Sequence, residues 1–336
     1  MKIVYMGTPD FAVPPLAALV KNGYEVTAVV TQPDKPKGRG KTLLPTPVKE
    51  EALKHGIPVY QPKKVRDPEF MEVLKELNPD IIVVAAFGQI IPKAILELPE
   101  FGCINIHASL LPKYRGAAPI QQAVIDGEKE SGVTIMQMGT GLDTGDMISQ
   151  TAVTLDEKET GGSLFDKLAD VGADLLVKTL PSVFDRTAVM KKQPEESPTP
   201  YASMITKQMG LMDFRKSAQE LERLVRGMNP WPSAYTFLNG KTFKIWEASV
   251  VSVLNGDGKP SAAPGTVIAA DSDREGIHVA CGKDILVLTE VQLEGKKRMD
   301  AASFLRGYQV EPQLPHTSAW SDCRLPRIWQ MMFLLP

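Results

Sequence analysis

Residues 2–31 read KIVYMGTPDFAVPPLAALVKNGYEVTAVVT and contain a strand, a helix and a second strand in succession. The runs Lys2–Met6 and Glu25–Thr31 are mostly apolar and rich in Val, as in strands that are covered on both faces. Val13–Lys21, which lies between them, has a helical pattern. A strand–helix–strand order is typical of parallel sheets, so this stretch predicts an α/β fold.

The same alternation continues through the first half of the chain. We expect further strands at Ile81–Phe87, Cys103–His107 and Val133–Met138, and further helices at Val48–His55, Pro68–Leu77, Pro119–Ile125 and Gly162–Phe184. The sequence therefore predicts a doubly wound, mostly parallel, Rossmann-like sheet. Such sheets bind ligands at the carboxyl ends of their strands, so polar residues that follow a strand are candidates for a site.

The pattern changes after residue 190. Lys191–Pro200, KKQPEESPTP, is rich in Pro and charge and predicts an extended linker. Beyond it, short apolar runs separated by Gly, Asn and Asp turns predict a small OB-like β-barrel. One helical pattern comes before these strand-like runs. The runs are Ala234–Leu238, Thr242–Val250, Gly265–Ala269, Gly276–Ala280 and Ile285–Val291. We expect domains at 1–190 and 205–314, joined by the linker 191–204, and we assign no function to the tail 315–336.

The composition limits the class of protein. The 336 residues are 43% hydrophobic and 23% charged, which is enough for two domains with cores of their own. The 38 basic and 40 acidic residues give a net charge of −2, which excludes a globally basic protein but allows a local basic patch. The three cysteines and four histidines lack the spacing of a disulfide framework or a zinc site, so we expect no metal. No targeting segment or long apolar run is present, so we expect a cytoplasmic protein without a membrane span.

The stretch Cys103–Gly116, CINIHASLLPKYRG, carries the first candidate site. Asn105 and His107 are two residues apart on an expected strand, so their side chains share one face near its carboxyl end. An Asn amide can donate a hydrogen bond to an oxyanion, and a His can donate one or transfer a proton. The alternative is a core Asn and His that merely end a strand, but the polar loop SLLPKYRG that follows favours a site.

The stretch Gly132–Ile148, GVTIMQMGTGLDTGDMI, carries the second candidate site. A strand leads into a loop in which three glycines surround Asp143, and glycine allows a close approach that other residues forbid. Asp143 can orient His107 and accept a proton. An ordinary Asp in a turn is the alternative.

Together these two stretches resemble the 10-formyltetrahydrofolate-dependent formyltransferase family. The catalytic Asn-x-His of that family corresponds to Asn105-Ile106-His107, and its catalytic Asp corresponds to Asp143 in LDTGD. The resemblance extends over residues 1–314. It implies that Asn105 and His107 stabilise the tetrahedral intermediate of formyl transfer, while Asp143 tunes His107 and assists proton transfer. It also implies a folate cosubstrate held by two loops, through Phe87, Gly88, Gln89, Ser109, Leu110, Leu111 and Pro112.

The segment Lys35–Lys41, KPKGRGK, holds four cations and no acid. This composition suits contact with a nucleic-acid backbone, although an exposed solvated loop is the alternative. This segment and the opening MGTPDFAVPPL are similar to the branch of the family that formylates the amine of initiator methionyl-tRNA. The resemblance implies a tRNA partner that contacts Lys35, Lys37, Arg39 and Lys41. We expect a monomer that binds no NAD, because G-x-G-x-x-G is missing after the first strand.

Other interpretations remain open at this point. The formyl acceptor can be glycinamide ribonucleotide or a UDP-linked amino sugar, the formyl group can be hydrolysed, or the protein can bind RNA without catalysis. The linker and the β-rich second half argue against the ribonucleotide enzyme, which is generally a single domain. The basic segment favours tRNA over a sugar, and the intact set of Asn105, His107 and Asp143 counts against a protein without activity.

Overall fold

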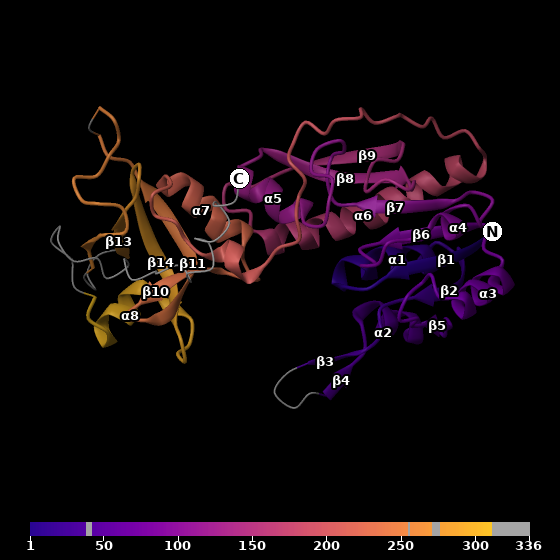
Figure 1. Cartoon of the computed structure of the whole chain (residues 1–336), viewed down its shortest axis with the longest axis horizontal. Helices are drawn as coiled ribbons and strands as arrows, with labels where there is room; N and C mark the ends of the chain where they lie inside the picture. The colour runs from indigo at the N-terminus through magenta and orange to yellow at the C-terminus, as the bar shows by residue number, and fades with distance from the viewer. Residues whose placement is uncertain (38–41, 255, 271–275, 311–336) are drawn as a thin grey trace, which may run out of the picture. The chain divides into compact units, whose positions relative to one another are not determined.

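The computed structural model describes residues 1–37, 42–254, 256–270 and 276–310 (Figure 1). Within these residues the chain divides into two compact units. The first unit holds Met1–Gln122, Glu128–Glu157 and Ser163–Met204, and the second holds Ala123–Gly127, Lys158–Gly162 and the chain from Ile205 onward. Arg39 and Lys41, two of the expected tRNA contacts, and the tail 315–336 lie outside the described residues.

The first unit is built on a seven-stranded sheet with the order β5-β2-β1-β6-β7-β8-β9. Its strands are β1 (Lys2–Gly7), β2 (Glu25–Val30), β5 (Val59–Tyr60), β6 (Ile81–Ala85), β7 (Cys103–His107), β8 (Glu130–Gln137) and β9 (Met147–Thr154). The neighbours from β5 to β7 are parallel, whereas β8 and β9 are antiparallel. The expected mostly parallel, Rossmann-like sheet is confirmed. Strand β9 was not expected, and it forms the edge beside β8.

Helices connect these strands, and four of them have proline in the first turn. Proline suits that position because the N–H that it lacks would have no partner there. The helices are α1 (Val13–Lys21), α2 (Pro47–Lys54), α3 (Pro68–Leu77), α4 (Lys93–Leu96), α5 (Pro119–Asp126) and α6 (Gly161–Phe184), with a 3-10 turn, η1, at Asp10–Ala12. Among the described helices, none is both long and apolar enough to cross a membrane.

The two faces of β7 are covered by different helices, and this decides where its side chains point. Helix α6 approaches one face so closely that a Cβ on Gly172 would lie 2.9 Å from a methyl carbon of Ile106. The other face belongs to a core that includes Cys103 and residues of α3 and α4. Since side chains alternate along a strand, Asn105 and His107 share the face of Cys103, opposite Ile106.

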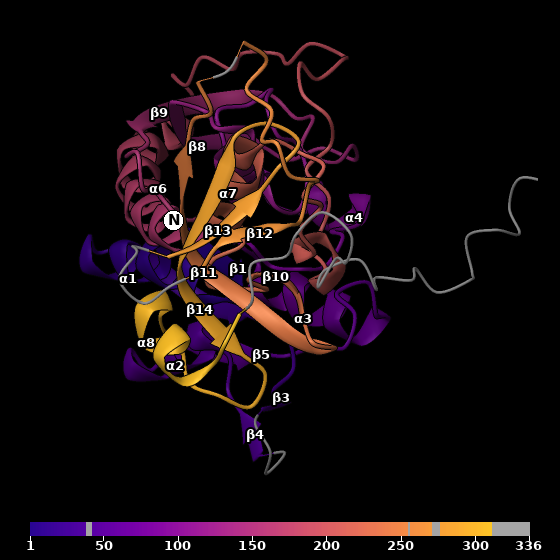
Figure 2. The same ribbon diagram turned by 90° about the vertical axis from the view of Figure 1, so that its left-hand side faces the viewer.

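The second unit is an antiparallel sheet with the order β10-β11-β14-β13-β12, and β15 pairs with β14. Its elements are η2 (Lys207–Gly210), α7 (Ala218–Gly227), β10 (Ala234–Leu238), β11 (Lys241–Val251), β12 (Val267–Ala269), β13 (Ile277–Ala280), β14 (Ile285–Leu293), β15 (Met299–Asp300) and α8 (Ala301–Gly307). Figure 2 shows the long strands β11 and β14 curving as they cross the unit.

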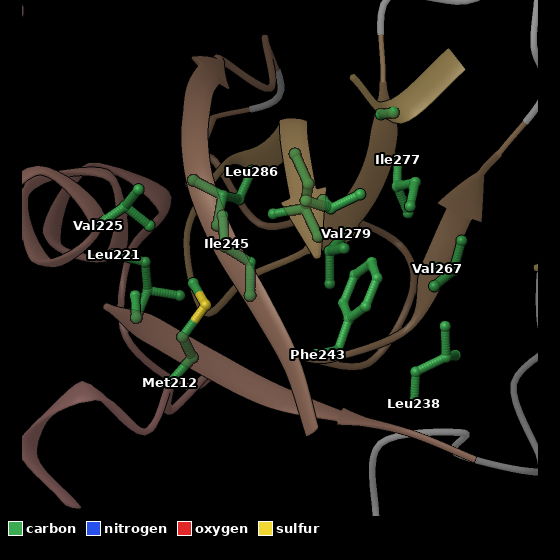
Figure 3. Packing of buried hydrophobic residues seen from close by; sticks show 14 of the residues in the cluster. Met212, Leu221, Val225, Leu238, Phe243, Ile245, Val267, Ile277, Val279 and Leu286 are labelled. Atoms are coloured by element: carbon green, nitrogen blue, oxygen red, sulfur yellow. The ribbon is translucent and has the colours of Figure 1, made fainter. Parts of the chain in front are cut away.

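One apolar core fills the inside of this curved sheet (Figure 3). Phe243 of β11 is fully buried at its centre, and Leu221 of α7 closes one side. Leu238 of β10 and Val267 of β12 come from the two ends of the strand order, yet both point into this core. The sheet is therefore curled rather than flat, which confirms the expected small β-domain. No pairing among the described strands joins β10 to β12, so the curl stays open.

Candidate active site

The Asn105 side chain lies on β7 and is half-buried. Its amide makes no hydrogen bond to the described part of the chain. A desolvated amide without a partner costs free energy, so proteins normally satisfy it. An amide left open at this position is suited to donate to a bound ligand.

His107 follows on the same face and is only 6% exposed. Its Nε2 lies 3.0 Å from the backbone oxygen of Tyr114. A carbonyl oxygen can only accept, so Nε2 carries the proton and donates it. The other nitrogen, Nδ1, lies 3.8 Å from Oδ1 of Asp143. The ring is therefore held by one nitrogen and presents the other to a carboxylate.

Asp143 reaches this position by a route that the sequence does not reveal. Strand β8 runs antiparallel to β7, so its last residue, Gln137, pairs with Ile104 near the beginning of β7. The loop from 139 to 146 must therefore fold back across the sheet to bring Asp143 to His107. Gly145 permits this path, because a Cβ there would lie 1.8 Å from the Gln137 oxygen.

The conformation of Asp143 sets it apart from an ordinary turn residue. Its φ is +52°, in the left-handed region that only Gly, Asn and Asp enter readily. Its Oδ2 accepts a hydrogen bond of 2.8 Å from the backbone N–H of Gly116. Burial raises the pKa of the Tyr201 hydroxyl, and the negative charge of Asp143 raises it further. The carboxylate is thus held by Gly116 through one oxygen and has the other oxygen near His107.

The loop Ser109–Pro112, an expected folate contact, is fastened to β8 by Thr134. The Thr134 hydroxyl donates to the Ser109 oxygen at 2.7 Å and accepts from the Leu111 N–H at 3.1 Å. The Ser109 hydroxyl donates to the Lys113 oxygen, and the Leu111 side chain is buried. The side chains of Ser109 and Leu111 therefore shape the loop itself.

The second expected folate loop, Phe87–Gln89, follows β6. Phe87 is buried, and Gln89 accepts a hydrogen bond of 2.9 Å from the Val65 N–H. Gly88 is exposed, with φ +82°. The sequence interpretation overlooked Ile90, which is 89% exposed directly after this loop. An apolar residue beside a Gly-bearing turn was the available signal.

The basic segment emerges from a polar cluster. Lys35 lies on β3 (Lys35–Lys37), which pairs antiparallel with β4 (Thr42–Leu44). Just before β3, Asp34 accepts a hydrogen bond of 2.6 Å from Nζ of Lys49 and one of 2.7 Å from Nε2 of Gln61. These bonds hold the pair of strands at the carboxyl end of β2. Lys37 also lies on β3, and its contribution remains a prediction.

The segment expected as an extended linker is bound to the loops of the site. The guanidinium of Arg115, which is 6% exposed, donates to Oε1 of Gln193 and to the backbone oxygen of Pro194. The Ala202 oxygen accepts from the N–H groups of Ala117 and Ala118. The sequence interpretation overlooked Arg115 and Gln193, because neither the loop SLLPKYRG nor the Pro-rich charged stretch indicates which of its residues are buried.

The chain matches a known family in both of its halves. Residues 1–180 match the family model described as formyl transferase, and residues 204–309 match the one described as formyl transferase, C-terminal domain. The chain belongs to the formyl transferase family. The resemblance stated from Asn105-x-His107 and LDTGD is thereby confirmed.

Two curated relatives of this formyl transferase are similar over nearly their whole length. The methionyl-tRNA formyltransferase of Lachnospira eligens is 56% identical over 93% of this chain and 98% of its own. That of Bacillus subtilis is 51% identical over 92% of this chain and 96% of its own.

A solved structure supports the fold. The N-formyltransferase from Helicobacter canadensis, in complex with folinic acid and dTDP-3-aminofucose, has a TM-score of 0.62. The alignment covers 86% of this chain and 99% of that one, at 21% identity. At this identity the likeness shows a shared fold.

No three His, Cys, Asp or Glu side chains gather as metal ligands among the described residues.

Proposed function

We propose that this formyl transferase moves the formyl group of 10-formyltetrahydrofolate to the α-amine of initiator methionyl-tRNA. The product, N-formylmethionyl-tRNA, serves translation initiation, and we place the enzyme in the cytoplasm as a monomer. The observation that carries the proposal is the 56% identity to a methionyl-tRNA formyltransferase over 93% of the chain. That similarity extends through both units and the segment between them, so it supports the acceptor as well as the donor.

The Asn105 amide is assigned to the oxygen that gains negative charge when the amine attacks. The substrate amine is the nucleophile, so the protein needs no Ser or Cys nucleophile. The amide has no partner among the described residues, and it lies beside His107 on one face of β7. A donor already in place costs no reorganisation during the reaction. One such donor typically contributes about a hundredfold to a thousandfold in rate.

His107 is assigned as the second donor to the same oxygen. Because Nε2 is bound to the Tyr114 oxygen, Nδ1 is the nitrogen that remains for the substrate and for Asp143. A negative carboxylate 3.8 Å from Nδ1 stabilises a positive ring. Asp143 also accepts the proton that the attacking ammonium group must lose.

The folate supplies the formyl group and leaves as tetrahydrofolate. The residues present fit such a group, since Asn105 pairs with Val84 near the end of β6, and the loop that follows β6 carries the exposed Gly88 and Ile90. We assign Phe87, Gly88, Gln89 and Ser109–Pro112 to folate binding. Since Gln89 and Ser109 already use their polar side-chain atoms in the fold, these loops hold the ligand mainly through backbone groups and shape.

The basic segment is assigned to the tRNA, with Lys35, Lys37, Arg39 and Lys41 contacting the phosphate backbone. The cluster of Asp34, Lys49 and Gln61 supports this role by holding the base of the segment. We further propose that the second unit contributes to tRNA binding, with domains at 1–190 and 205–314 and a linker at 191–204.

The test is transfer of labelled formyl from 10-formyltetrahydrofolate to four acceptors offered in parallel. They are charged initiator tRNA, charged elongator tRNA, glycinamide ribonucleotide and a UDP-linked amino sugar. We expect label on the initiator methionine alone. Label on a small amine overturns the tRNA acceptor, free formate with every acceptor indicates a hydrolase, and RNA binding without turnover indicates a binding protein.

A further inference from the structure

Residues 193–202, here called the strap, lie along the loop that follows His107 and the loop that carries Asp143. Figure 1 shows the chain after α6 as a long extended segment, and its first part pairs with β9 through Lys191 and Met147. We propose that the strap is a working part of the active site, in which Gln193 positions Asp143 and Thr199 positions His107. The inference rests on the proposed function, because it concerns the geometry of that reaction.

Gln193 connects three parts of the site through one buried side chain. It is 6% exposed, and its Nε2 donates to the backbone oxygen of Asp143 at 2.9 Å and to that of Gly145 at 2.7 Å. Its Oε1 accepts from Nε of Arg115 at 3.1 Å. Arg115 donates in turn to the strap at the Pro194 and Glu195 oxygens. The amide therefore ties the Asp143 loop to a fixed guanidinium.

This tie matters because no strand holds Asp143. The residue lies in a loop with φ +52°, a conformation that costs free energy unless its surroundings enforce it. Two hydrogen bonds from one buried amide to the oxygens at 143 and 145 supply that constraint. Without them the loop is free to relax, and the carboxylate moves away from Nδ1 of His107.

Thr199 acts on the other partner, through Tyr114. The Tyr114 N–H donates to the Thr199 hydroxyl at 2.7 Å, and the Tyr114 oxygen accepts from Nε2 of His107 at 3.0 Å. Tyr114 itself has φ +57°, which is unusual for a bulky residue. The strap thus holds the peptide whose oxygen orients the imidazole.

At Gly116, the strap lies so close to the loop after β7 that no side chain fits between them. A Cβ on Gly116 would lie 2.5 Å from the Ala202 oxygen and 2.8 Å from the Tyr201 ring. Its φ of +124° also favours glycine. Since the Gly116 N–H donates to Asp143, this contact joins the strap, the loop and the carboxylate at one point.

Three variants of the full-length enzyme test the proposal. Gln193→Glu keeps the acceptor for Arg115 but places a carboxylate against the Asp143 and Gly145 oxygens. Gln193→Met keeps the size and removes both functions. Glu196→Gln is the matched control, because Glu196 is exposed on the same strap and its side chain makes no hydrogen bond or ion pair with the described residues.

We expect kcat to fall about tenfold to a hundredfold in both Gln193 variants, since displacement of a catalytic group by about 1 Å has effects of this size. KM for the folate and the tRNA stays unchanged, as does the activity of the control. The pH–rate profile also changes shape, because Asp143 no longer faces His107 at a set distance. Thr199→Val removes the acceptor for Tyr114 and is expected to lower kcat less, again without a change in KM.

Several outcomes overturn the proposal. They are wild-type kcat in Gln193→Glu, a rise in KM without loss of kcat, or a loss that only follows the unfolded fraction measured by thermal melting. If both Gln193 variants fail to fold, Thr199→Val decides by the same criteria. A wild-type enzyme without formyl transfer would instead refute the proposed function.

Discussion

The two sides of the proposed active site are held in place by different means. Asn105 and His107 belong to β7, whose backbone is bonded on both sides and whose opposite face is pressed against α6. Asp143 lies in a loop and is held by hydrogen bonds from Gly116 and Gln193. The strand positions side chains by alternation alone, whereas the loop depends on partners from distant parts of the sequence. The comparison predicts that a substitution on β7 removes a functional group without moving the others. A substitution around the loop should instead displace Asp143.

Asn105→Ala is expected to cause the largest loss. Because β7 is held independently of this side chain, the fold is retained and kcat falls by about a hundredfold to a thousandfold. Asn105→Asp is expected to be at least as inactive, since a carboxylate of the same shape cannot donate. Formyl transfer and thermal melting measure the two effects.

His55→Ala is the control for this substitution. His55 is another polar residue of the first unit and lies at the end of α2. It is expected to leave kcat unchanged. An active Asn105→Asp enzyme contradicts the role of Asn105 as a hydrogen-bond donor. It also contradicts the prediction that substitutions on β7 act by removing a functional group.

Asp143→Asn is expected to come next. Asn tolerates the left-handed backbone and still accepts from Gly116, so the loop keeps its path while the negative charge is lost. We expect kcat to fall by about a hundredfold, as for a positioned group that moves a proton. Steady-state kinetics across pH check this. If Asn at this position retains full activity, the loop serves only to shape the site.

Thr134→Val sharpens the comparison from the side of the folate loop. Thr134 is fully buried on β8, and its hydroxyl bonds Ser109, Leu111 and Gln150. Loss of the hydroxyl leaves buried polar groups unpaired, so we expect a destabilisation of about 2 kcal/mol. The KM for the folate should rise more than kcat falls, because this loop is assigned to binding. Denaturant unfolding and kinetics measure both, and an unchanged KM argues against that assignment.

Asp34→Asn tests a loop that is held by charge, and its effect should be the smallest. The hydrogen bonds from Lys49 and then Gln61 lower the pKa of Asp34 below its ordinary value of 3.8. A lowered folded-state pKa means that the stabilisation is present above the ordinary value and is lost as the pH falls through the folded value. The difference in Tm between wild type and variant should be largest at neutral pH and should shrink as the pH falls below 3.8 and through the lowered folded-state pKa.

The same measurement of Tm against pH on Gln193→Met distinguishes a loop held by an amide from one held by a carboxylate. The Gln193 amide bonds two backbone oxygens and the Arg115 guanidinium and involves no carboxylate, so its contribution should not disappear in the same acid range. Equal pH dependence in both variants contradicts the distinction.

The regular elements were largely predictable because their signals are local. Helices α1 and α3 and strand β7 have the predicted bounds. Strand β9 was missed because MISQTAVT contains many polar residues. It is an edge strand with one exposed face, and among the described residues its backbone pairs with β8 and, at Met147 only, with Lys191. The β3–β4 pairing was missed for a similar reason, since Pro and Gly in the basic segment indicate only a loop.

The sequence by itself determined the family, the mostly parallel sheet and the curled second sheet, and placed Asn105 and His107 on one face of a strand. These follow from apolar periodicity, alternation and motifs that lie within a few residues. Only the tertiary structure decided how Asp143 reaches His107, because β8 reverses direction and the loop must fold back. It also decided that a charged, Pro-rich segment binds the site through Gln193 and Thr199. Contacts between residues 50 or 85 positions apart depend on how the chain packs, and no local pattern encodes them.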